Sequence, residues 1–241
     1  MLDGLKRFFS GGTTSPAPEW EGIAPWAESR HHTYREVPGE GFVIDGLLGT
    51  TAWRMEWGPA QRPYIGGNEL RIRAELGLAS ELQLVLMNRQ LQEAMEKAMF
   101  EQFVEGVQTR IDDQTPPEMR WLVMYPKLSG ADMPLLRERY VALSSVKQWL
   151  LHWLDGPLTP ALAGLTVPTD VPVLLMIGRG RLTLRTALAD AEVAVVQGWL
   201  RLFETAVREA QRLAEAGAAV DEQPTAPSLW PPSVLPGEGR R

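Results

Sequence analysis

The sequence predicts an α+β protein in which a mostly antiparallel sheet packs against amphipathic helices. Short runs of apolar or alternating residues, typical of strands, occur in groups along the chain. Helical stretches follow these groups instead of alternating with single strands. The resulting order of strands, helix, strand, helices, strands and helix therefore favours an antiparallel sheet over a doubly wound parallel one.

Residues 42–48 and 51–57 are predicted to form a hairpin, because Gly49 supplies the turn between them. The second strand alternates Trp53, Met55 and Trp57 with charged residues, so the tryptophans are expected to face the core.

A weak internal duplication is a further expectation, because a pattern of strand, turn, strand and helix occurs twice. It places the two halves at 34–105 and 106–215. The first copy covers strands at 69–76 and 82–87 and a helix from Asn88. The second covers strands at 171–177 and 181–185 and a helix from Asp190.

Between the two copies, residues 106–112 are expected to form a further strand. Residues 115–118 then match a capping box, with Thr115 capping a helix and Glu118 reaching back. Residues 145–148 repeat that pattern before a second helix, which residues 155–157 should end. A short helix is expected over residues 159–164.

The last helix, residues 190–215, is the most regular predicted element. Its apolar residues recur at alternating spacings of three and four and form a wide stripe. Two interpretations of this stripe are open: it packs on the sheet of its own domain, or it forms the seam of a homodimer. The stripe comprises Val193, Val196, Leu200, Phe203, Val207, Ala210 and Ala214, widened by Trp199, Leu202, Ala206 and Leu213.

The chain has 241 residues, 44% of them hydrophobic, which is enough for a substantial core. Proline- and glycine-rich composition at both ends predicts an irregular segment over 1–33 and a disordered tail over 216–241, around a single domain at 34–215. The absence of cysteine fits a cytoplasmic protein without disulfides. No apolar run predicts a membrane span, and a net charge of −6 disfavours nucleic acid as a partner.

No motif in the sequence predicts a catalytic site, a metal site or a cofactor. His31 and His32 are adjacent and His152 is isolated, so no metal-ligand spacing is present. The glycines of 65–68 and 177–180 match neither nucleotide-binding pattern and are interpreted as turns between strands.

Arginines supply one candidate binding surface. Strand alternation puts them opposite the apolar positions, where neighbouring strands would form a band able to hold phosphate or carboxylate groups. Glu56, Glu69 and Glu75 share the same faces, so arginine–glutamate pairing without a ligand is the alternative interpretation. The candidate residues are Arg54, Arg71, Arg73, Arg181 and Arg185.

The first ten residues supply a second candidate surface. Leu2, Leu5, Phe8 and Phe9 would share one face of a short amphipathic helix that could dock on a partner protein, on its own domain, or weakly on a membrane surface.

Three functional hypotheses follow from these observations. The absence of catalytic motifs and the composition of the ends favour a non-catalytic adaptor that binds another protein. The arginine band favours a module for a small anionic ligand. An enzyme without a recognisable motif is the third hypothesis.

Overall fold

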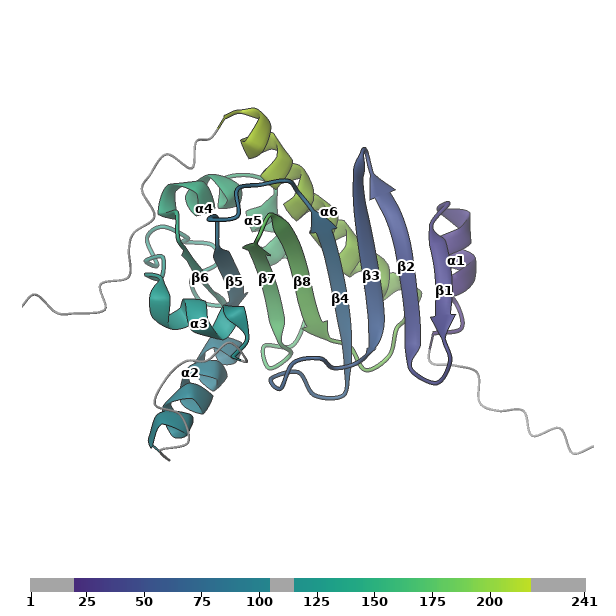
Figure 1. Ribbon diagram of the computed structural model, residues 1–241, viewed down its shortest axis with the longest axis horizontal. Helices are drawn as coiled ribbons and strands as arrows, with labels where there is room; N and C mark the ends of the chain where they lie inside the picture. The colour runs from purple at the N-terminus through teal and green to yellow at the C-terminus, as the bar shows by residue number, and fades with distance from the viewer. Residues whose placement is uncertain (1–19, 105–114, 218–241) are drawn as a thin grey trace, which may run out of the picture.

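The computed structural model describes residues 20–104 and 115–217, and within them eight antiparallel strands form one sheet (Figure 1). The strand order across the sheet is β1-β2-β3-β4-β8-β7-β5-β6. The strands are β1 (Thr33–Val37), β2 (Gly41–Leu48), β3 (Thr51–Pro59), β4 (Asn68–Glu75), β5 (Leu84–Asn88), β6 (Tyr140–Ser144), β7 (Val173–Gly178) and β8 (Arg181–Ala187). The helices are α1 (Ile23–Ser29), α2 (Arg89–Val104), α3 (Pro117–Met124), α4 (Lys147–Leu154), α5 (Leu158–Ala163) and α6 (Val193–Glu215). The predicted α+β class is thus confirmed.

The predicted first hairpin is formed by β2 and β3. Gly49 lies in the turn with φ of 60°, a conformation that glycine adopts at little cost. Trp53 and Trp57 are each 3% exposed and face the core, as expected. The alternation along β3 therefore decides which face of the strand is buried.

The two copies of the strand–strand–helix pattern differ in topology, which contradicts the expected duplication. β7 and β8 pair directly as a hairpin, whereas β4 and β5 are separated by β8 and β7. The helices that follow also lie on opposite faces of the sheet, since α2 and α6 pack in different hydrophobic clusters. The similarity is therefore one of local patterning alone.

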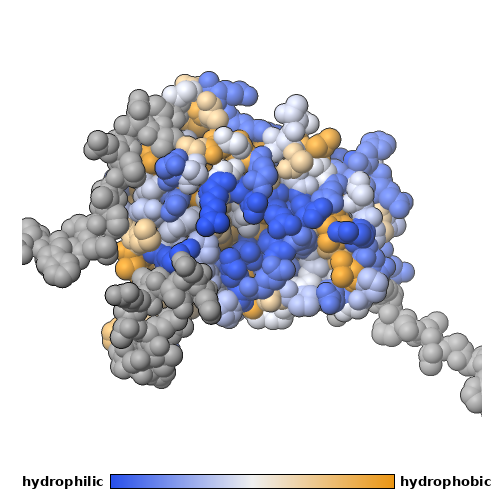
Figure 2. Space-filling view, in the orientation of Figure 1, coloured by the Kyte–Doolittle hydropathy of each residue, from blue (hydrophilic) through white to orange (hydrophobic). Residues whose placement is uncertain are grey.

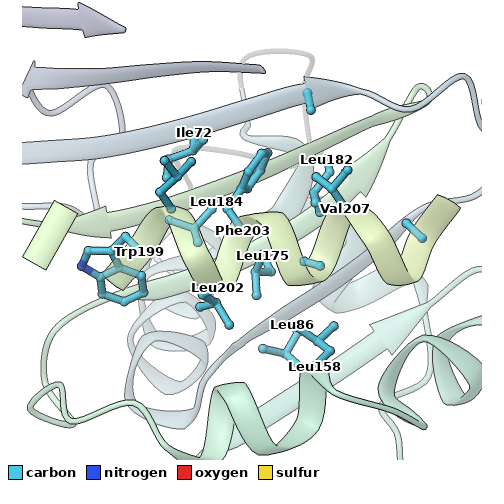
Figure 3. Packing of buried hydrophobic residues seen from close by; sticks show 14 of the residues in the cluster. Ile72, Leu86, Leu158, Leu175, Leu182, Leu184, Trp199, Leu202, Phe203 and Val207 are labelled. Atoms are coloured by element: carbon cyan, nitrogen blue, oxygen red, sulfur yellow. The ribbon is translucent and has the colours of Figure 1, made fainter. Parts of the chain in front are cut away.

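One face of the sheet is covered by α1, α4, α5 and α6, and the larger hydrophobic core lies between them (Figures 1 and 3). Figure 3 shows Phe203 and Val207 of α6 beside Leu182 and Leu184 of β8. In the same view, Leu158 of α5 and Leu86 of β5 lie on the other side of α6 from Leu182 and Leu184. α6 is therefore the central helix of this layer.

The apolar stripe of α6 packs inside its own chain. Val196 and Phe203 are fully buried, and Val207 is 1% exposed. The indole Nε1 of Trp153 in α4 donates a hydrogen bond of 3.0 Å to the Ala206 carbonyl oxygen, which fixes α4 against α6. This packing contradicts the homodimer seam, because the stripe is already covered.

Among the described residues, helices cover the opposite face of the sheet only over β7, β5 and β6. There α2 and α3 pack on Val85, Met87, Leu143, Leu174 and Met176 with a methionine-rich surface. Methionine fills irregular gaps well, which suits two helices that cross a twisted sheet. Neither hydrophobic cluster includes a residue that β1 to β4 or β8 presents on this second face.

Residues 1–33 were expected to be irregular, but α1 occupies residues 23–29. Ile23 and Ala27 are fully buried, and Trp26 is 9% exposed. A helix of two turns is too short to show a sustained periodicity of apolar residues, so the sequence does not predict α1.

The predicted cap of α4 is also wrong. α4 begins at Lys147 without a side-chain cap, and the Ser145 hydroxyl instead donates to the Glu81 carbonyl oxygen at 2.9 Å and accepts from the Gln83 amide at 3.0 Å. The Ser145 side chain therefore stabilises the segment before β5 and does not cap α4. The expected strand at 106–112 lies outside the described residues, and none of the helices described is long and apolar enough to cross a membrane.

Candidate functional site

The structure brings the five arginines singled out from the sequence onto the open face of the sheet. β3, β4 and β8 are neighbours, and their register places Arg54 opposite Arg73, Arg71 opposite Arg185 and Glu75 opposite Arg181. Figure 2 shows the result as a hydrophilic band over the middle of the sheet. We call Arg54, Arg71, Arg73, Arg181 and Arg185 the arginine band.

Carboxylates accompany every member of the arginine band. Arg73 Nη2 lies 3.0 Å from Glu56 Oε1, and Arg71 contacts the other oxygen of the same carboxylate. Glu56 therefore serves two guanidinium groups. The remaining pairs are Arg54–Asp45 at 2.6 Å, Arg181–Glu75 at 2.6 Å, and Arg185–Glu69.

The centre of the band is buried and crowded with positive charge. The side chains of Arg71 and Arg185 are 11% and 9% exposed, and the Nε of each is buried without a hydrogen-bond partner. Burial, followed by the charges of Arg185 and Arg73, lowers the pKa of Arg71 to about 10. Such crowding means that the band would be stabilised by an added negative charge.

A cleft of about 490 Å³ lies at one end of the band, between α3 and the β7–β8 hairpin. Five arginines line it, and none of the described residues that line it is a carboxylate. Arg181 and Arg185 were expected from the sequence, whereas the other three arginines were not. The lining residues are Arg62, Gln83, Pro117, Arg120, Trp121, Met176, Gly178, Arg179, Arg181, Thr183 and Arg185.

The β7–β8 turn holds Arg179 at the rim of the cleft. Arg179 adopts φ of 54° between two glycines, so the turn depends on a left-handed backbone. A Cβ at Gly178 would lie 2.5 Å from the Trp121 ring, and one at Gly180 would lie 2.9 Å from the Leu78 carbonyl oxygen. The glycines thus let α3 and the segment before β5 close on the turn from both sides.

A buried carboxylate fixes the wall of the cleft formed by α3. Glu118 is fully buried, and its Oε1 accepts hydrogen bonds from Arg62 Nε at 2.6 Å and from Tyr64 Oη at 2.5 Å. Burial and the charge of Glu118 raise the pKa of Tyr64 well above its usual value. Glu118 therefore ties α3 to the β3–β4 connection, which places Arg62 in the cleft.

The expectation that Glu118 caps α3 is consequently wrong. The helix begins at Pro117, after Pro116, and the carboxylate points to the loop residues Arg62 and Tyr64 instead of the helix start. A capping box and a buried ion pair use the same residue type, so the spacing alone does not separate them.

Local patterning gave no signal for Arg62, Arg120 and Arg179. Arg62 lies in a loop and Arg120 in a short helix. Arg179 lies in a turn that the flanking glycines predict, but those glycines indicate no role for the arginine itself. Arginine between two glycines at a hairpin turn is the one feature that a sequence search for anion sites could use.

The three histidines, which all lie within the described residues, form no comparable site. No cluster of metal-ligating side chains occurs within residues 20–104 and 115–217. His32 packs edge-on against Trp53 with ring centres 4.8 Å apart, and His152 lies 3.2 Å from the Gln148 amide nitrogen. Leu2, Leu5, Phe8 and Phe9 lie outside the described residues.

Comparisons with known proteins show a structural similarity but no family. No protein-family model matches the chain, and no curated protein matches it. Among solved structures, the chain is similar to the mycobacterial trehalose monomycolate transport factor A, TtfA, with a TM-score of 0.44 and 11% sequence identity. The match covers 78% of this chain and 90% of that one. A similarity of this size does not extend to function.

Proposed function

We propose that this protein binds an anionic ligand, bearing phosphate or carboxylate groups, in the cleft between α3 and the β7–β8 hairpin. The observation that carries the proposal is the convergence of five arginines on one cleft, with no carboxylate among the described residues that line it. The chain as a whole has a net charge of −6, so this local excess of arginine is not a general property of its surface.

The arginines of the cleft differ in how firmly their present partners hold them. Arg181 pairs with Glu75 at an exposed position, where the side chains are 49% and 66% exposed. Such a pair contributes roughly 0 to 1 kcal/mol, whereas a hydrogen bond to a charged group in a less exposed site contributes roughly 1.5 to 3 kcal/mol. A ligand in the cleft can therefore replace Glu75 as the partner of Arg181.

Arg62 and Arg185 are held differently. Their carboxylate partners, Glu118 and Glu69, are 0% and 2% exposed, so these pairs stay in place and fix the guanidinium groups. Fixed donors lose little conformational entropy when a ligand binds. Firm arginines at the base and an exchangeable one at the rim are a suitable arrangement for capturing an anion.

The lining favours binding over catalysis. Within residues 20–104 and 115–217, it offers guanidinium groups, an amide, a threonine hydroxyl and apolar side chains, but no histidine or carboxylate placed to act as a general base. An acidic or phosphorylated segment of another protein could supply the anion, and that case would unite this proposal with the adaptor hypothesis. The parts of that hypothesis that concern the two ends of the chain rest on residues outside the described ranges.

Calorimetric titration with inorganic phosphate and pyrophosphate tests the proposal. We expect exothermic binding that weakens as salt is added, because screening acts on exposed charges. The double variant Arg179→Gln/Arg181→Gln should lose that binding while it keeps the wild-type circular dichroism spectrum.

The matched control is Arg208→Gln. Arg208 is also an arginine paired with a glutamate at an exposed position, but it lies on α6, which covers the other face of the sheet. The control should bind as the wild type does. Equal binding by the double variant, or no binding of either anion by the wild type, would refute the proposal.

A further inference from the structure

We infer that the ligand carries two or more phosphate groups and extends from the cleft along the sheet to a second anion-binding point at Arg73 and Thr183. This inference rests on the proposed function and names the ligand class. The juxtaposition that carries it is that of Arg73 on β4 with Thr183 and Arg181 on β8.

The register fixes the spacing between the two points. Arg73 lies directly opposite Thr183, and Arg181 is two residues from Thr183 along the same strand. Arg73 and Arg181 are thus diagonal neighbours, whose backbone positions are about 7 to 8 Å apart in an antiparallel pair. Arginine side chains can span part of this separation, so a single linear anion can contact both.

Arg73 is more exposed than the centre of the band, so a ligand can reach it from the surface of the sheet. Its side chain is 35% exposed, against 11% for Arg71 and 9% for Arg185. Thr183 lines the cleft and is partly exposed, so the second point adjoins the cleft. In Figure 2 the hydrophilic band continues over the sheet without an apolar interruption at its middle.

Arg73 also lacks a carboxylate of its own. Its partner Glu56 is shared with Arg71, so one negative charge serves two positive ones. Burial, followed by the charges of Arg181 and Arg54, lowers the pKa of Arg73. Arg54 is held by Asp45 through two hydrogen bonds of 2.6 and 3.1 Å and is therefore a poorer candidate for a ligand.

The number of donors favours phosphate over carboxylate. Each guanidinium group offers five N–H donors, and a phosphate group presents three strong acceptor oxygens where a carboxylate presents two. Several arginines around one cleft therefore exceed what one carboxylate can accept. A chain of phosphate groups supplies acceptors at both points.

The test compares orthophosphate, tripolyphosphate and citrate as probes of the full chain by calorimetric titration. We expect the wild type to bind tripolyphosphate about tenfold or more tighter than orthophosphate, since one added charge-assisted contact is worth about that factor. Citrate should bind more weakly than tripolyphosphate at equal salt. Citrate binding as tight as that of tripolyphosphate would overturn the assignment to phosphate.

The variant Arg73→Gln separates the two points. It should lower the affinity for tripolyphosphate about tenfold and leave orthophosphate binding unchanged, whereas Arg179→Gln should weaken the binding of both. Arg73→Lys keeps the charge but loses the planar fork, so its effect should be intermediate. Thermal unfolding of each variant, with Arg208→Gln as control, shows whether the fold is kept.

The outcomes distinguish the inference from the proposal on which it rests. If orthophosphate binds in the cleft and Arg73→Gln changes neither probe, or changes both equally, the second point does not exist and the proposed function stands. If the wild type binds neither orthophosphate nor tripolyphosphate, both are wrong.

Discussion

The ion pair between Arg62 and Glu118 gives a sharp test of the structure, because its two members differ in burial. The Glu118 side chain is fully buried and the Arg62 side chain is 23% exposed. Replacing Arg62 by methionine leaves a carboxylate inside the protein with Tyr64 as its remaining partner. Removing one partner of a buried pair typically costs about 3 to 5 kcal/mol.

Protonation of Glu118 limits how much free energy the unpaired buried carboxylate can cost. An ordinary glutamate has a pKa of about 4.3, so holding any glutamate protonated at pH 7 costs about 3.7 kcal/mol. We therefore expect Arg62→Met to lower the free energy of unfolding by about 3 kcal/mol at pH 7, or the Tm by about 6 to 12 °C. At pH 5, holding a glutamate protonated costs only about 1 kcal/mol, so Arg62→Met should lower the free energy of unfolding by less than it does at pH 7.

The reverse substitution should cost less. Glu118→Met removes the buried charge, and Arg62 can then turn into the cleft that it already lines. We expect a loss of about 1 to 2 kcal/mol, from the lost hydrogen bonds of Tyr64 and Arg62. The double variant should resemble Glu118→Met, because neither charge then remains.

Thermal and urea denaturation followed by circular dichroism, at pH 5 and pH 7, measure these differences. Arg208→Met removes an exposed pair with Glu204 and serves as the control, with an expected change below about 0.5 kcal/mol. The reasoning fails if Arg62→Met costs no more than Glu118→Met, or if its cost is the same at both pH values.

Three further predictions follow from the packing. Phe203→Asp should abolish the cooperative unfolding transition, since it buries an unpaired charge; a folded variant that only changes its oligomeric state on a sizing column would contradict this packing. Gly41→Ala should lower the free energy of unfolding by about 2 to 4 kcal/mol in urea denaturation, because a Cβ there would lie 2.0 Å from the Trp57 carbonyl oxygen. A Cβ at Gly39 meets no atom, so Gly39→Ala should cost about 1 kcal/mol. Equal costs of the two substitutions would refute the register of β2 and β3. Burial is the main cause of the raised pKa values of the chain's four tyrosines, so phenolate absorbance should appear above the ordinary pKa of about 10 in the folded protein and near pH 10 in urea. The contribution of these tyrosines to stability should be lost as the pH rises through their pKa values in the folded protein. Coincident titration curves of the folded and unfolded protein would refute the burial. The tyrosines are Tyr34, Tyr64, Tyr125 and Tyr140.

Local patterning predicts a good part of this fold because it acts through neighbouring residues. Alternation along β3 and β4 decides which side chains face the core, and the spacing in α6 decides which face is buried. The pairing of β4 with β8 is different, since it joins segments far apart in the chain. No local pattern contains that information, which is why a duplication with two similar halves was predicted and a single interleaved sheet was found.

The same limit applies to the candidate site. Strand alternation places Arg71 and Arg185 each on the face of its strand opposite the apolar side chains. Only the pairing of β4 with β8 sets the two arginines opposite each other. Arg62 and Arg179 belong to connections, whose positions depend on what packs around them. A cleft built from a loop, a helix and a hairpin turn is a product of tertiary structure alone.

The arrangement of charges in the arginine band is unfavourable for stability alone. Like charges directly opposite on neighbouring strands are destabilising, and this sheet holds two such pairs, Arg54 with Arg73 and Arg71 with Arg185. Replacing Arg73 by a glutamate would give Arg54 an opposite charge and leave Glu56 to Arg71. Departures from locally favourable choices are expected at functional sites, where another requirement outweighs stability. An anion bound at the band would turn the repulsion among these arginines into attraction, and we therefore expect bound tripolyphosphate to raise the Tm of the wild type more than that of Arg73→Gln.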